Sequence, residues 1–127
     1  MLDGGTRAGP SSWPAVDRSI ALRAGLGQAV SVTLVALLLG VLLPTAFFED
    51  WGWLAGPGAW AACALAVGTW LGLAPLPVLA GAALAGLPSL AAVLAGQHWA
   101  GAPLGVLCFA LWCGWLAGPR GARAVTA

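Results

Sequence analysis

Hydrophobic residues run through this chain in long, uninterrupted stretches. Residues 24–48 carry no charge and are centred on VTLVALLLGVLL. A helix needs about 20 predominantly apolar residues to cross a hydrocarbon layer about 30 Å thick. The stretch meets that requirement, and it is longer than the apolar region of a secretory signal peptide, which is about 7–15 residues. We therefore predict a transmembrane helix here, with a cleaved signal peptide as the alternative interpretation.

Prolines and tryptophans divide the remaining apolar sequence into three further segments. The predicted spans are residues 53–74, 76–96 and 101–118. At 1.5 Å per helical residue, Trp53 to Trp70 and Trp99 to Trp115 each cover roughly 25 Å, close to the separation of the two aromatic belts of a membrane protein. The tryptophan spacing and the division by prolines therefore support the same four spans.

The charged residues predict the orientation of these spans. All arginines lie near the two ends of the sequence, at positions 7, 18, 23, 120 and 123. Arg-rich flanks favour the cytoplasmic side, and both ends can lie there only when the number of spans is even. We therefore predict an all-α integral membrane protein, a bundle of four transmembrane helices at 13–119 with both termini cytoplasmic. Residues 1–12 are expected to be a disordered cytoplasmic tail and 120–127 a second cytoplasmic tail.

The two adjacent acids of the chain lie in FFEDWGW, residues 47–53. This topology makes the stretch the first external loop, with Glu49 and Asp50 facing water between aromatic rings. An acidic cation-binding mouth is the alternative, although two carboxylates are few ligands for a hard cation. His98 is expected in the third loop, also external, as an interfacial residue or, alternatively, as a pH sensor or ligand site.

Composition narrows the class and source of the protein. The chain has 127 residues, of which 61% are hydrophobic and 7% charged, compared with about 25% charged residues in soluble domains. A net charge of +1 without clustered basic residues argues against nucleic-acid binding. Lys, Asn and Tyr are absent and Ala, Gly and Leu dominate, which indicates a GC-rich, bacterial genome. We expect a multi-pass protein of the inner or plasma membrane.

Small residues recur at four-residue spacing in the predicted spans. Such spacing favours close helix approach inside lipid, where ordinary hydrophobic association is weak. The predicted packing residues are Ala64, Gly68 and Gly72 in the second span and Gly81, Ala85 and Ser89 in the third. They predict a tightly packed bundle, either within one chain or between subunits.

A few polar or helix-breaking residues in the spans could line a pathway. Gln28 and Ser31 share a helix face in the first span, where they would form interhelical hydrogen bonds or contact a substrate. Pro88 is expected to kink the third helix and free a carbonyl group, either as a packing feature or as the broken helix of a transport site.

Residues for catalysis or coupled transport are missing. No Asp, Glu, Lys or Arg lies inside a predicted span, whereas coupled carriers generally use an intramembrane ionisable group. Cys108 and Cys113 lack the CxxC spacing of a redox pair. We expect no enzyme activity, cofactor or metal site, and a non-catalytic accessory or scaffold subunit that packs in the bilayer against another membrane protein or itself. The alternative is a small homo-oligomeric channel or facilitator for a neutral or weakly charged solute.

Overall fold

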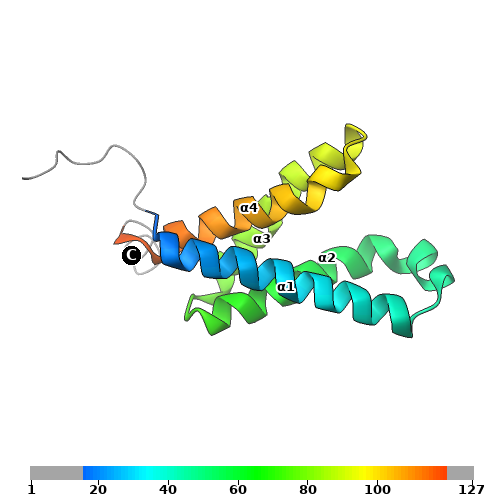
Figure 1. The fold of residues 1–127 in the computed structure, drawn as a ribbon, viewed down its shortest axis with the longest axis horizontal. Helices are drawn as coiled ribbons and strands as arrows, with labels where there is room; N and C mark the ends of the chain where they lie inside the picture. Colours follow the sequence, from blue (N-terminus) through cyan, green and yellow to red (C-terminus); the bar gives the residue numbers. More distant parts are fainter. Residues whose placement is uncertain (1–15, 120–127) are drawn as a thin grey trace, which may run out of the picture.

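The computed structural model describes residues 16–119, and all regular secondary structure in that range is helical. The helices are α1 (Arg18–Leu42), α2 (Thr45–Trp70), α3 (Pro75–Leu94) and α4 (His98–Ala117), as Figure 1 shows. The expected tails at 1–12 and 120–127 lie outside the described residues. The prediction of an all-helical chain with four helices is confirmed for this range.

Three of the helices are long and apolar enough to cross a membrane. These are α1, α3 and residues Trp99–Ala117 of α4. The chain is therefore a multi-pass membrane protein by the length and composition of its helices. The helix α2 is not among them, because its glycines, its tryptophans and Pro57 lower its hydropathy.

Local sequence accounts for where the helices begin and end. Asp17 caps α1, its Oδ1 accepting a hydrogen bond from the Ile20 backbone N–H at 3.1 Å. Gly72 and Gly96 follow α2 and α3 with φ of +74° and +79°, a conformation that glycine adopts without steric cost. After α2, the Leu73 N–H donates to the Gly68 carbonyl at 2.8 Å, which is the hydrogen bond of a Schellman motif.

The largest differences from the predicted boundaries occur in α1 and α2, which begin and end four to eight residues earlier than expected. The stretch 47–53 was expected to be an external loop, and this is wrong: it lies inside α2, and the chain turns instead at Leu43 and Pro44. Pro44 is extended, with ψ of 156°, and α2 begins directly after it. Glu49 and Asp50 are exposed in the second turn of α2. Two adjacent acids therefore do not by themselves indicate a loop.

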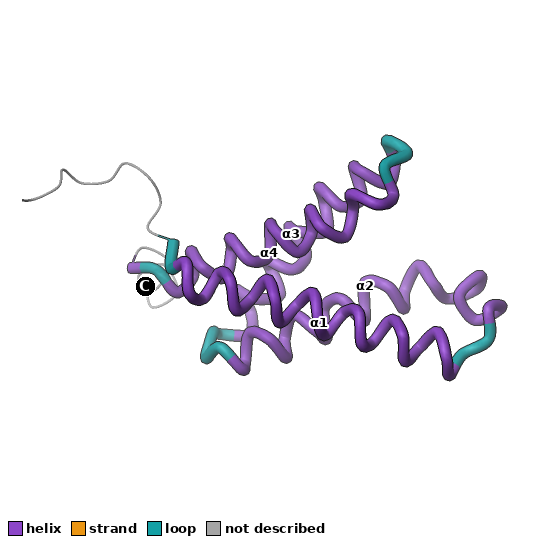
Figure 2. Tube along the Cα trace, in the orientation of Figure 1, coloured by secondary structure: helices purple, strands orange, loops and turns teal. Residues whose placement is uncertain are grey.

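The four helices form two antiparallel hairpins, α1–α2 and α3–α4, which pack against each other. The helix α1 packs against α2 and α4, and α3 packs against α4 and α2. The backbone N–H of Asp17 donates to the Gly114 carbonyl at 3.0 Å, which ties the start of α1 to the end of α4. At the opposite end the loops 43–44 and 95–97 lie far apart (Figure 2). The hairpins therefore converge at one end and diverge at the other.

The buried core follows this shape. Its members include Ala24, Val67, Val78, Phe109 and Cys113, all from the convergent half of the bundle. The helix α1 buries Ala24 and Gln28 and no residue beyond them. The second half of α1 consequently has one face against α2 and the rest of its surface exposed, as expected for a helix that faces lipid.

Glycines set the closest helix contacts. A Cβ on Gly68 would lie 2.7 Å from Cγ2 of Val78, and a Cβ on Gly81 would overlap the indole of Trp112. Ala64 and Ala85 are also buried. Gly72, by contrast, lies beyond the end of α2 in the turn, so its expected place in a helical row of small residues is wrong.

Candidate functional site

The fully buried amide of Gln28 joins α1 to α2. Its Nε2 donates to the Trp60 carbonyl at 3.3 Å. Its Oε1 is buried and has no hydrogen-bond partner among the described residues. The geometry is that of an interhelical hydrogen bond in the protein interior, one of the two roles that the sequence left open for this residue.

The hydroxyl groups nearby bond to their own helix. Ser31 Oγ donates to the carbonyls of Gly27 at 2.7 Å and Gln28 at 3.2 Å. Thr33 and Thr69 donate in the same way to carbonyls three or four residues earlier. These bonds satisfy the hydroxyl groups locally and leave them no need of a partner on another helix.

Pro88 lies within α3, which runs as one helix from Pro75 to Leu94. Pro57 and Pro103 occupy interior positions of α2 and α4 in the same way. Of the predicted pathway residues, Gln28, Ser31 and Pro88, none lines any of the three cavities described below.

Two tryptophans brace the bundle through hydrogen bonds to α3. Trp60 Nε1 donates to the Ala82 carbonyl at 3.1 Å, and Trp112 Nε1 donates to the Pro77 carbonyl at 2.8 Å. The Trp60 ring also makes an edge contact with Phe109 of α4, with ring centroids 6.3 Å apart. The Trp60 carbonyl accepts the hydrogen bond from Gln28 of α1. Trp60 therefore contacts a residue of each of the other three helices.

Sequence reasoning missed these two residues. It used tryptophans only as markers of the membrane interfaces, whereas Trp60 and Trp112 lie away from the ends of their predicted spans. A buried tryptophan in an apolar helix still needs an acceptor for its N–H. That requirement was the available signal for an interhelical bond.

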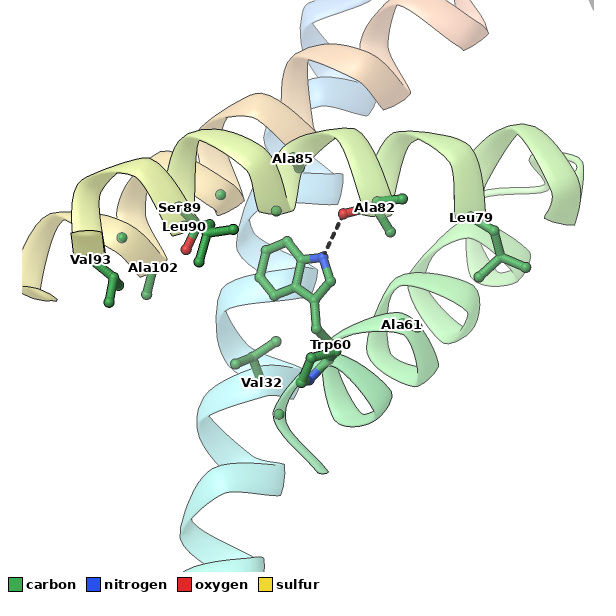
Figure 3. Close-up of a pocket in the computed structure, with 16 residues that line it drawn as sticks. Val32, Trp60, Ala61, Leu79, Ala82, Ala85, Ser89, Leu90, Val93 and Ala102 are labelled. Carbon is green, nitrogen blue, oxygen red and sulfur yellow. Dashed lines mark hydrogen bonds between the residues drawn. The ribbon is translucent and has the colours of Figure 1, made fainter. Parts of the chain in front are cut away.

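The divergence of the hairpins leaves a half-open cleft of about 670 Å³ between them. Residues of all four helices line it, and Figure 3 shows the Trp60 indole at its inner side, bonded to Ala82. The walls are almost entirely apolar, and Ser89 is the lining residue that adds a hydroxyl group. Gly56 of α2 and Gly86 of α3 also line it, and a Cβ at either position would meet no atom within 4 Å.

Two further cavities lie beside α1. One, of about 590 Å³, lies between α1 and α4, and the other, of about 270 Å³, lies between α1 and α2. Trp60 lines both of these and the cleft. This side chain thus occupies the point where the hairpins cross.

The predicted external residues do not form one site. Glu49 and Asp50 are exposed near the start of α2, and His98 begins α4. The loops that precede these two helices lie far apart in Figure 2. Within residues 16–119, no group of three or more His, Cys, Asp or Glu residues could hold a metal ion.

The cysteines are free thiols in apolar surroundings. Cys63 and Cys113 are buried and Cys108 is half-buried. No known protein family, curated protein or solved structure matches this chain. A functional proposal therefore rests on the residues and contacts of the chain itself.

Replacing Gln28 by leucine is expected to leave the free energy of unfolding unchanged or raise it by about 1 kcal/mol. The lost hydrogen bond is worth about 0.6 kcal/mol in a membrane protein, whereas an unsatisfied buried polar atom costs about 1–3 kcal/mol. Gln28→Ala is the control, because it leaves a void and should lower the stability by about 2 kcal/mol. Unfolding in mixed micelles measures the free energy of unfolding of both variants. A loss above about 1 kcal/mol in Gln28→Leu would show that Oε1 has a partner in solution.

Proposed function

We propose that this chain is a non-catalytic membrane subunit or scaffold that acts by packing its helices against another membrane protein or against itself. The proposal rests on the hydrogen bonds that the interior polar groups form between helices. Gln28, Trp60 and Trp112 each donate to a backbone carbonyl of a neighbouring helix. Polar groups used in this way stabilise a fixed bundle, and they supply no acid, base or nucleophile to a cavity.

We further propose that α2 crosses the membrane as well, giving four spans with both termini cytoplasmic in the inner or plasma membrane of a bacterium with a GC-rich genome. The 26 residues of α2 would cover about 39 Å as a helix. Its packing against α1 and α3 supports a position inside the bundle. The bond between Asp17 and Gly114 supports the placement of both arginine-rich ends on one side.

Single cysteines at positions 44 and 122, in a variant lacking Cys63, Cys108 and Cys113, test this topology. A membrane-impermeant maleimide applied to intact cells is expected to label position 44, in the turn between α1 and α2, and not position 122. Permeabilised cells should show labelling at both positions, which controls for reactivity. Labelling of position 122 in intact cells would rule out the arrangement with both termini cytoplasmic.

Gentle solubilisation of native membranes, followed by capture of the tagged chain and mass spectrometry, tests the subunit role. A larger membrane protein recovered at fixed stoichiometry is the expected result. Recovery of the chain alone, at a defined multiple of 12.6 kDa, would instead favour the homo-oligomeric channel or facilitator. Purified protein would then be assayed for solute flux in liposomes.

A further inference from the structure

The tips of the two hairpins are packed very differently. In the α3–α4 hairpin, Gly101 is buried, and a Cβ there would lie 3.1 Å from the Ser89 Oγ. In the α1–α2 hairpin, a Cβ on Gly40 or Gly56 would meet no atom within 4 Å. None of residues 34–55, which we call the outer tip, is buried. The α3–α4 hairpin is therefore closely packed almost to its end, whereas the outer tip of the α1–α2 hairpin is not.

The helix α2 is weakened directly below the outer tip. Pro57 has no N–H to donate to the carbonyl four residues earlier, at Trp53, and an interior proline is a common cause of helix kinks. Gly56 and Gly58 lie on either side of it, and glycine stabilises a helix interior less than other residues do. All buried residues of α2 come after this point. Gly56–Gly58 is therefore the place where α2 bends most easily.

The helix α1 has a weak point at the same level. Ser31 Oγ and Thr33 Oγ1 each donate at 2.7 Å to the carbonyl four residues earlier, and back-bonding of this kind often bends a helix. Val32 and Gly56 line both the cleft and the smaller cavity between α1 and α2, which places the two weak points side by side. The hairpin can therefore bend here without separating its two helices.

The part of the bundle below these weak points is fixed by hydrogen bonds. Among the described residues, the side chains that donate to another helix are Gln28, Trp60 and Trp112, and none of their bonds involves the outer tip. On its α3 side the outer tip faces the cleft of about 670 Å³. Segments with few buried contacts are the first to move in a folded protein. The outer tip thus has a fixed base and open space beside it.

We infer that the outer tip swings as one body on a double hinge, 31–33 in α1 and 56–58 in α2, and that this swing opens and closes the cleft against α3. A bend of about 20°, as in a sharp helix kink, would displace the end of an arm about 18 Å long, from Pro57 to Thr45, by roughly 6 Å. The inference goes beyond the packing role proposed above and does not depend on it.

Distances between paired spin labels test the hinge in the full-length protein in nanodiscs. The labels are attached to a ketone-bearing amino acid at positions 42 and 94, near the ends of the two hairpins, so that the native cysteines stay in place. Positions 22 and 94 form the reference pair, because Leu22 lies on α1 below the hinge. Leu22, Leu42 and Leu94 are all highly exposed. Double electron–electron resonance should give a distribution for 42–94 that is roughly 6 Å wider than that for 22–94.

A stiffened hinge provides the matched comparison. Ser31→Ala, Thr33→Ala and Pro57→Ala together remove both back-bonds and restore the missing N–H, so the 42–94 distribution should narrow to the width of the reference pair. Thr69→Ala with Pro88→Ala makes the same kinds of change outside the hinge and should leave the distribution wide. Equal widths of the two pairs in the unmodified protein would overturn the inference. So would a width that the hinge variant leaves unchanged, or an equal narrowing in both variants.

Discussion

Replacing Gly81 by leucine is expected to lower the free energy of unfolding by about 3 kcal/mol, the upper end of the range for overpacked cores. Even a Cβ at this position would overlap the indole of Trp112. The ring would have to move, and its hydrogen bond to the Pro77 carbonyl, 2.8 Å long, would break. Because this bond joins α4 to α3, the substitution should separate the two helices.

Gly86→Leu is the matched control, since Gly86 lies five residues further along the same helix and faces open space. It carries the same gain in helix propensity, up to about 1 kcal/mol, without the overlap. Unfolding by denaturing detergent in mixed micelles compares the two variants. Equal stability of Gly81→Leu and Gly86→Leu would mean that α3 and α4 do not approach as closely as the structure shows.

Replacing Trp60 by alanine is expected to lower the free energy of unfolding by about 3 kcal/mol. This is the lower end of the range of about 3–5 kcal/mol for truncating a large aromatic core residue, because Trp60 is partly buried. The substitution removes the bond to Ala82 and the edge contact with Phe109. It also merges the three cavities that the Trp60 side chain now lines. All four helices should therefore lose packing, and the loss should be cooperative.

Trp70→Ala is the control for this second substitution, because Trp70 belongs to the same helix and is exposed. It should change the stability by less than about 1 kcal/mol, as is usual for exposed positions. The stability of Trp60→Phe should lie between those of Trp60→Ala and Trp70→Ala, since this variant keeps an aromatic ring and loses the N–H donor. Thermal unfolding followed by near-ultraviolet circular dichroism measures all three. Similar melting of Trp60→Ala and Trp70→Ala would contradict the bracing role of Trp60.

The length of the apolar segments was enough to predict the helices. A run of about 20 uncharged residues in a membrane must pair its backbone polar groups internally, and a helix does so within one segment. This length was not enough to predict the start of α2. Glu49 and Asp50 suggested a loop because charge is costly in lipid, but both lie exposed in the second turn of α2. Pro44 was the better marker, since it lies directly before the helix that the structure begins at Thr45.

The contacts of the site were harder to predict. The spacing of Gly68 and Gly81 indicated close packing, but the sequence does not say that these glycines face Val78 and Trp112. Those pairings depend on how the helices are rotated and crossed, which residue spacing along one helix does not determine. The cleft was beyond prediction for the same reason, since it results from the divergence of whole hairpins.

The order of helix packing has a consequence for biosynthesis. The helix α1 packs more extensively on α4 than on α2, and a Cβ on Gly25 would lie 3.2 Å from the Ala110 Cβ. A ribosome releases α1 first and α4 last, since chains are made from the N-terminus. The first helix to enter the bilayer therefore obtains its most extensive packing partner only after the rest of the bundle has been synthesised.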